Sequence, residues 1–315
     1  MSQQRAFLGM THTPLLGLNP LPADIDAELG SAITGVAQRI RAWAPDRVVI
    51  IGPDHYNGFF NELMPPFCIG TEATAVGDFI TLAGPLNVDA AVAVGLAGWL
   101  MDHDFDVAVS RRMRVDHGFS QNLEQIWGSL ATPPIVPIFM NCVAQPGVAR
   151  LRRCRQLGHA LGAYLDTLPG RTLVMGSGGL SHEPPVPTLA HPDLAVRERI
   201  IVKQEATPAE RAIKTERVKA AGLAMAGGNS GIKPLNPQWD KVWMDALESG
   251  NLDALMTQTE EDITREAGVS AHESKTWLIA RAAMPAGVPL KSALRYYRDI
   301  PALIAGYGIL FMHTD

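Results

Sequence analysis

Residues 6–51 decide the fold, because they contain two short apolar runs on either side of one helical pattern. The first run is AFLGM (6–10), the second is RVVII (47–51), and the segment from Asp24 to Trp43 between them has helical periodicity. Short apolar runs bounded by turn residues are typical of buried strands. We therefore expect a strand, a helix and a second strand, which is the repeating unit of parallel α/β sheets.

Two further apolar runs extend this alternation. They are IVPIFM (135–140) and TLVM (172–175), and a helical stretch over about residues 148–168 separates them. Charged helix formers dominate from about residue 189 to 227, and helical periodicity continues from 237 to 283 with Trp239, Trp243 and Trp277 as expected core anchors. The expected fold class is α/β, with a central mostly parallel sheet flanked by helices and a largely helical C-terminal half. Residues 1–315 are expected to form a single domain.

Composition excludes several classes of protein. Hydrophobic residues make up 47% of the 315 residues, which excludes disorder as the main state, and 27 basic against 32 acidic side chains argue against nucleic acid as a partner. The longest apolar run, 302–312, is interrupted by glycine and is far shorter than the roughly 20 residues of a membrane helix, so no membrane partner is expected. Three widely spaced cysteines and a polar start without an export signal predict a cytoplasmic location.

Four histidines stand where a functional site is expected in such a fold. His12 follows the first apolar run, His55 follows the second, His182 follows the run at 172–175, and His117 lies in VDHG (115–118). Ligands of open α/β sheets bind beyond the carboxyl ends of the strands, and neighbouring Gly, Pro and Asp residues hold side chains in fixed turns. The other histidines lack such surroundings and are expected to be structural, apart from His272, which adjoins Glu273 and stays open.

The histidines indicate metal chemistry. Two neutral imidazoles and one carboxylate form a facial triad that leaves positions on ferrous iron open for substrate and dioxygen. The chain has many acidic residues, and their spacing alone does not choose the carboxylate.

The GSG segment at 176–178 invites two other interpretations, and neither fits. A nucleophile elbow needs glycine two residues before Ser177, where Met175 stands, and the dinucleotide fingerprint needs glycine where Ser181 stands. We expect the glycines to form a tight turn that presents His182.

Several segments together resemble the class III extradiol ring-cleaving dioxygenases, and the resemblance spans nearly the whole chain. The segments are THTP (11–14), PDHYNGFF (53–60), MPPF (64–67), VDHGF (115–119), GSGGLSH (176–182), PPVP (184–187), LNPQWD (235–240), HE (272–273), KTW (275–277) and RYYR (295–298). The resemblance implies a single catalytic domain that opens a catechol ring beside its diol and incorporates both atoms of dioxygen. The likeness is greatest to members of the family that act on 2,3-dihydroxyphenylpropionate, which implies that substrate and also 2,3-dihydroxycinnamate.

The same resemblance implies roles for five residues. Residues matching His12, His55 and Glu273 would hold Fe(II), so that Glu273 supplies the carboxylate. His117 would act as proton donor and His182 as proton acceptor, and imidazoles suit both tasks because their ordinary pKa is roughly 6.5. The implied partners are a small aromatic diol and dioxygen, and the implied assembly is a homo-oligomer, with a tetramer as the expected form.

Other functions stay open at this stage. A metal-dependent hydrolase could use the same ligands to activate water, and cleavage of another substituted catechol would need only a different pocket. A binding protein without activity would have little reason to keep all four histidines. The aromatic and proline segments at 56–60 and 64–67 are expected to form an apolar wall for an aryl substrate. The sequence does not choose a cation for a substrate carboxylate among Arg111, Arg112, Arg114, Lys275 and others.

Overall fold

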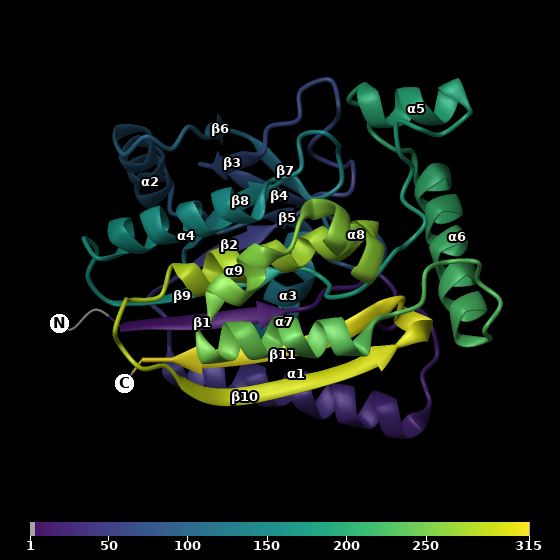
Figure 1. Ribbon diagram of the computed structural model, residues 1–315. Helices are drawn as coiled ribbons and strands as arrows, with labels where there is room; N and C mark the ends of the chain where they lie inside the picture. The colour runs from purple at the N-terminus through teal and green to yellow at the C-terminus, as the bar shows by residue number, and fades with distance from the viewer. Residues whose placement is uncertain (1–3, 315) are drawn as a thin grey trace.

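The computed structural model describes residues 4–314 and contains a central eight-stranded sheet of order β10-β11-β1-β9-β2-β8-β3-β6 (Figure 1). Its four inner strands, β1 (Gln4–Met10), β9 (Arg171–Ser177), β2 (Arg47–Gly52) and β8 (Ile135–Met140), are parallel to one another. All four apolar runs read from the sequence are therefore inner strands. The expected α/β class with a mostly parallel sheet is confirmed.

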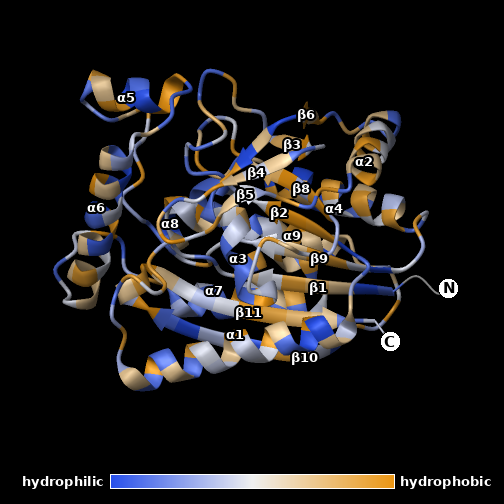
Figure 2. Ribbon diagram, turned by 180° about the vertical axis from the view of Figure 1, so that it is seen from behind, coloured by the Kyte–Doolittle hydropathy of each residue, from blue (hydrophilic) through white to orange (hydrophobic). Residues whose placement is uncertain are grey.

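Helices cover both faces of the sheet. α1 (Ala23–Trp43) and α3 (His117–Trp127) pack on one face, and α2 (Ala90–Asp102), α4 (Leu151–Leu165), α7 (Pro237–Ser249) and α9 (Lys275–Ala282) pack on the other (Figures 1 and 2). Alternate side chains of β2 serve the two layers: Val49 and Ile51 belong to one hydrophobic cluster, and Val48 and Ile50 belong to the other. This alternation is the period of two that a buried strand requires.

The largest difference from the sequence expectation is a hairpin at the end of the chain. β10 (Lys291–Ile300) and β11 (Ala305–His313) are antiparallel, joined by the short helical turn η3 (Pro301–Leu303), and β11 pairs antiparallel with β1. The apolar run at 302–312 is thus mostly a buried strand inside the sheet.

Short strands also occur between β2 and α3. β3 (Phe67–Gly70) and β6 (Ala108–Ser110) extend the main sheet, and β4 (Ala73–Val76), β5 (Ala83–Pro85) and β7 (Met113–Val115) form a small second sheet of order β5-β4-β7. These strands carry Asp78 and Asp116 in the turns beside them, which brings both carboxylates to the carboxyl edge of the main sheet.

The segment from 189 to 283 is mostly helical, as expected, but it is divided into short pieces. In order these are α5 (Leu194–Ile201), α6 (Pro208–Ala226), α7, η1 (Leu252–Thr257), α8 (Glu260–Ala267), η2 (Val269–Ser274) and α9. Trp243 and Trp277 are fully buried and Trp239 nearly so, which confirms them as core anchors.

The helix α6 lies apart from the layered body, at the right of Figure 1. It begins with Pro208 after a capping box in which Thr207 and Glu210 bond to each other's backbone. One side of it packs on the body, because a Cβ at Gly222 would lie 2.4 Å from the Ala302 carbonyl oxygen and 2.8 Å from the Leu15 side chain. α6 therefore stands over the carboxyl end of β1 and the amino end of β11, where η3 leads into that strand.

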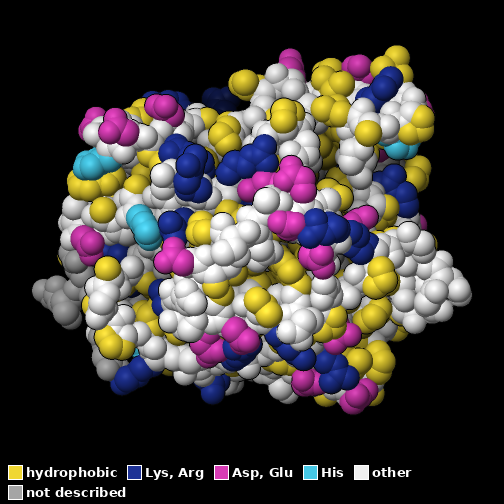
Figure 3. Space-filling model, in the orientation of Figure 1, with side chains coloured by type: hydrophobic (Ala, Val, Ile, Leu, Met, Phe, Trp, Pro, Cys, Tyr) yellow, Lys and Arg dark blue, Asp and Glu magenta, His cyan; other side chains and the backbone are white. Residues whose placement is uncertain are grey.

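Among residues 4–314, no helix is both long and apolar enough to cross a membrane. The face shown in Figure 3 carries basic and acidic side chains side by side rather than in separate areas.

Candidate functional site

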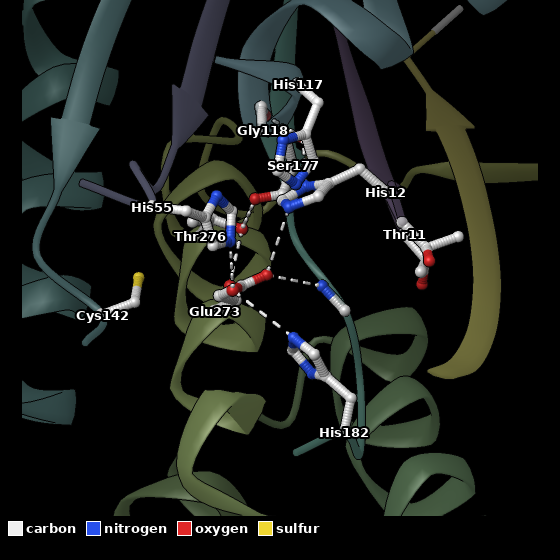
Figure 4. Close-up of polar contacts among 12 residues, drawn as sticks. Thr11, His12, His55, His117, Gly118, Cys142, Ser177, His182, Glu273 and Thr276 are labelled. Atoms are coloured by element: carbon white, nitrogen blue, oxygen red, sulfur yellow. Dashed lines mark hydrogen bonds and ion pairs between the residues drawn. The ribbon is translucent and has the colours of Figure 1, made fainter. Parts of the chain in front are cut away.

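The structure brings together all five residues singled out from the sequence. His12 follows β1, His55 follows β2, His182 follows β9, His117 begins α3, and Glu273 lies in η2, just before α9. Figure 4 shows these side chains converging from separate elements, with Glu273 among them. The ring centroids of His12, His55 and His117 lie 4.5 to 5.5 Å apart.

The Glu273 carboxylate is the centre of the cluster. Its Oε1 lies 3.2 Å from His55 Nε2 and 3.4 Å from His182 Nε2, and its Oε2 lies 3.4 Å from His12 Nε2. The backbone N–H of Gly179 donates to Oε2 at 3.1 Å. Glu273 is fully buried, so these contacts are made away from solvent.

Glycines allow Glu273 to reach this position. A Cβ at Gly178 would lie 2.7 Å from the Glu273 carbonyl oxygen and 2.8 Å from its Cβ, and a Cβ at Gly176 would lie 2.5 Å from the Trp277 nitrogen. Neither glycine has a positive φ. The glycines of the GSG segment therefore serve the close approach of η2 and α9 to the end of β9, in addition to any role in turning the chain.

Each imidazole is held through its Nδ1 atom. The partners are Ser177 Oγ for His12 at 3.0 Å, Asp116 Oδ2 for His55 at 3.1 Å, Asp78 Oδ2 for His117 at 2.6 Å and the Leu180 carbonyl oxygen for His182 at 3.0 Å. Ser177 donates its own hydroxyl proton to the Gly118 carbonyl at 2.6 Å, so it accepts from His12. All four rings thus donate from Nδ1 and keep Nε2 for the site, which is the usual arrangement of metal-binding and proton-transferring histidines.

Sequence reasoning missed two of these partners. Asp116 caps α3 and also accepts from the His55 backbone N–H and from Asn57, and Asp78 accepts from the His117 backbone N–H. Asp116 stands directly before His117 in the sequence, so a turn carboxylate beside a functional histidine was a usable signal. Asp78 lies 39 residues from His117 in the chain and had no such signal.

Burial and charge determine the ionisation of the cluster. Burial lowers the pKa of His12 to about 3. Burial would raise the pKa of Glu273, but the facing His182 and His12 hold it well below its usual range. His12 is therefore neutral and Glu273 ionised, which are the forms that bind metals.

The neighbouring carboxylates are ionised as well. Burial opposes this, but His55 and His117 hold the pKa of Asp116 well below its usual value, and His117 lowers the pKa of Asp78. Against the same burial penalty, Asp116 raises the pKa of His55 well above its usual value, and Glu273 raises that of His182. The site is thus a buried set of alternating negative carboxylates and imidazoles.

His12, His55 and Glu273 fit a divalent metal ion. Ligand atoms about 2.1 Å from a shared ion and at right angles lie about 3.0 Å from each other. Each imidazole is near that spacing from one carboxylate oxygen, His55 Nε2 at 3.2 Å from Oε1 and His12 Nε2 at 3.4 Å from Oε2. His117 also offers an atom within 4.8 Å of His12 and His55. Its ring, however, is stacked on His55 with an interplanar angle of 15°, so the lone pairs of the two rings run in parallel planes and do not converge on one point.

A cavity of about 320 Å³ opens on this cluster. His12, His55, His117 and His182 form its floor, and Tyr56, Phe60, Phe79, residues 184–187 and one side of α6 form its walls. Tyr56 and Phe60 come from the aromatic segment that the sequence suggested as a substrate wall, whereas Phe59 stacks on Phe139 in the core with ring centroids 3.7 Å apart. The cavity suits a flat apolar ligand with a few polar groups.

His272 does not belong to the site. It is buried, its Nε2 lies 2.9 Å from Thr264 Oγ1, and the neighbouring Lys275 bonds to Glu260. The buried Lys275 is thereby excluded as a cation for a ligand in the cavity.

The chain is similar to known proteins over nearly its whole length. Residues 6–308 match the family described as the catalytic LigB subunit of aromatic ring-opening dioxygenase. Proteins named 2,3-dihydroxyphenylpropionate/2,3-dihydroxicinnamic acid 1,2-dioxygenase are similar along their whole length. The one from Comamonas testosteroni is 62% identical over 98% of this chain and 97% of its own. The one from Cupriavidus pinatubonensis is 46% identical over 97% of this chain and 96% of its own.

A solved structure of an uncharacterized protein from Escherichia coli K12 has the same fold, with a TM-score of 0.51 and 14% identity over 99% of both chains. The family match and the similarity to the Comamonas protein confirm the resemblance that the sequence motifs indicated. The chain belongs to the LigB family, the catalytic subunits of aromatic ring-opening dioxygenases.

Proposed function

We propose that this protein is a non-haem Fe(II) extradiol dioxygenase that cleaves 2,3-dihydroxyphenylpropionate, and also 2,3-dihydroxycinnamate. The ring bond between a hydroxylated carbon and the substituted carbon beside it breaks, both atoms of dioxygen enter the product, and the product is of the 2-hydroxy-6-oxonona-dienedioate type. The observation that carries the proposal is the convergence of His12 and His55 on the buried Glu273 carboxylate at the floor of an apolar cavity. The substrate follows from the names of relatives that are similar along the whole chain.

In this proposal His12, His55 and Glu273 hold the iron. When bound by two imidazoles and one carboxylate, ferrous iron keeps open positions at which a catechol and dioxygen can meet. Ser177 and Asp116 hold the two ligand imidazoles in the required tautomer, because each accepts the Nδ1 proton.

His182 serves as the proton acceptor. Its Nδ1–H is bound to the Leu180 carbonyl, so Nε2, on the side that faces Glu273, is the atom that exchanges a proton with the cavity. A catechol bound at the cavity floor must lose a proton, and this nitrogen is available to take it.

His117 serves as the proton donor. Asp78 accepts the Nδ1 proton at 2.6 Å, so the ring is held with Nε2 toward the cavity. From Nε2 the ring can donate a proton to oxygen in the cavity. Phe79 contacts His117 edge to face, with centroids 5.1 Å apart, and keeps one side of the ring apolar.

We further propose that the chain acts as one catalytic domain, because both hydrophobic clusters lie against the same sheet. The three cysteines are free and buried, which supports a reducing cytoplasm. A role in the breakdown of 3-phenylpropionate rests on the family resemblance and on the substrate named for the relatives. A homo-oligomer, with a tetramer as the expected form, rests on the family resemblance, and light scattering would measure it.

Oxygen uptake and product formation test the function. The protein is loaded anaerobically with Fe(II), mixed with aerated 2,3-dihydroxyphenylpropionate, and followed with an oxygen electrode and by absorbance of the yellow ring-fission product. We expect equal amounts of oxygen consumed and product formed, with higher kcat/KM than for catechol or protocatechuate.

The control is the same protein loaded with Zn²⁺, which should consume no oxygen. Faster cleavage of another catechol would support the proposed reaction but contradict the proposed substrate. Absence of oxygen uptake with verified iron content, together with hydrolysis supported by Zn²⁺, would overturn the dioxygenase and favour the hydrolase.

A further inference from the structure

The cavity has an outer wall that carries positive charge. Besides the histidines of its floor, it is lined by four basic residues of α5 and α6, Arg199, Arg211, Lys214 and Arg217, and by two carboxylates, Asp78 and Glu210. Asp78 is engaged by the ring and the backbone N–H of His117, although its charge is also felt by Lys214. Glu210 is already held by Thr207 in the capping box that starts α6. The cations considered from the sequence, Arg111, Arg112, Arg114 and Lys275, are not among the lining residues. A negatively charged part of a ligand would therefore be attracted to α6.

Lys214 contacts residues beside the reaction centre. Its Nζ is 3.4 Å from the carbonyl oxygen of His55 and 5.9 Å from the centroid of the Phe79 ring, and Phe79 contacts His117. The ammonium is thus next to two of the residues that surround the cavity floor. It is half-buried, which strengthens an ion pair relative to one in open water.

The other three cations are less suited to the role. Arg211 donates to the backbone carbonyls of Ala206 and Val76, so its guanidinium is engaged. Arg199 and Arg217 are exposed, and their charges are well solvated. An ammonium has three donors, and among the described residues Lys214 uses one in a hydrogen bond, a long one.

We propose that Lys214 is the residue that binds the carboxylate of the substrate side chain and so selects catechols with an acidic substituent. The inference rests on the proposed function, because the diol must bind at the cavity floor for the side chain to point toward α6. The apolar ring of Phe79, beside Lys214, is suited to contact the carbon chain between the aromatic ring and the carboxylate. Lys214 is a binding residue here and takes no part in bond breaking.

The experiment compares a carboxylated substrate with a neutral one of the same shape. Dissociation constants of 2,3-dihydroxyphenylpropionate and 3-propylcatechol are measured anaerobically by calorimetry with the Fe(II)-loaded protein, and kcat and KM are then measured in air. Lys214→Met should weaken binding of the propionate ten- to a hundredfold, the range expected for losing a hydrogen bond to a charged group, with a matching rise in KM. The dissociation constant of 3-propylcatechol should stay within about twofold of the wild-type value, since this ligand has no carboxylate to lose its partner.

Two variants complete the design. Lys214→Arg should restore most of the propionate affinity because it keeps the charge. Lys219→Met removes another α6 lysine, one that pairs with Glu216 and does not line the cavity. It should leave the affinity for both substrates unchanged.

The inference is overturned if Lys214→Met weakens the binding of both catechols equally or lowers the iron content. Lys214 would then act by holding the backbone of the iron ligand His55. The inference is also overturned if neither affinity changes, or if the wild-type protein does not prefer the propionate. Failure of the wild-type protein to cleave any catechol would instead overturn the proposed function, so the two failures are distinguishable.

Discussion

Single side chains orient the histidines of the site by binding the Nδ1 atom of each ring. Two of the four Nδ1 partners, Asp116 and Asp78, are buried carboxylates that also accept backbone N–H groups, so each is fixed before it orients a ring. Such outer partners raise the basicity of an imidazole and hold its direction. Their removal should therefore affect metal binding or turnover according to the ring that each one serves.

Substitution of Asp116 is expected to weaken metal binding. Asp116→Asn keeps the shape but removes the negative charge at His55 Nδ1, so Fe(II) affinity should fall 10- to 100-fold, the usual cost of losing such a partner. Titration with a chromophoric chelator measures it. Asp253→Asn, an exposed carboxylate far from the site, is the control, and equal chelator midpoints for both variants would refute the role.

For Asp78 the expected effect is on turnover. Asp78→Asn should lower kcat by roughly 10- to 100-fold, a part of the 10²- to 10⁴-fold that general acid catalysis supplies, because the donor His117 loses its anionic partner. Iron content and anaerobic substrate affinity should stay at wild-type values. A loss of iron with unchanged kcat per iron would show that Asp78 supports the metal site instead.

At the scale of elements, the sequence predicted what local periodicity can encode. The four inner strands, α1 and α4 follow from apolar runs and helical spacing, and the expected ends lie within a few residues of the observed ones. The β10–β11 hairpin was missed because a glycine-interrupted apolar run has no clear period of its own, and its pairing partner β1 is about 300 residues away in the chain. Lys214 could not be chosen for a similar reason, since only the docking of α6 brings it to the cavity.

The docking of η2 and α9 on β9 gives a prediction at this scale. Gly178→Ala would force a methyl group against the Glu273 backbone and Cβ, so iron content and activity should both fall while far-ultraviolet circular dichroism stays close to wild type. Gly98→Ala in α2 is the matched control. It has no neighbour within 4 Å of the new methyl group and should stabilise the protein by about 0.5–1 kcal/mol. Full iron content in Gly178→Ala would contradict the close-approach argument.

At the scale of the whole molecule, Asp240 connects separate parts of the fold. It lies in α7, accepts from the Ser181 backbone and hydroxyl at the turn after β9, and accepts from the Tyr297 hydroxyl on β10. Burial raises its pKa to about 6 despite these hydrogen bonds. The free energy of unfolding should therefore depend on whether the Asp240 carboxyl group is protonated.

The sign of this dependence follows from the two pKa values. An unfolded chain releases the Asp240 proton near pH 3.9, so between about pH 4 and pH 6 the folded state holds the extra proton and loses stability as the pH rises. The loss is roughly 3 kcal/mol at most. Urea unfolding at several pH values should show this slope in the wild type and not in Asp240→Asn, and parallel profiles for the two proteins would contradict it.

We propose that His12, His55 and Glu273 hold the metal, while His117 and His182 move protons. This proposal is tested most directly by the iron content of single alanine variants after identical anaerobic loading with Fe(II) and desalting. We expect little iron in His12→Ala, His55→Ala and Glu273→Ala, whereas His117→Ala and His182→Ala should keep the wild-type iron content and lose turnover. Retention of iron by Glu273→Ala together with its loss from His117→Ala would contradict the account and assign the third ligand to His117.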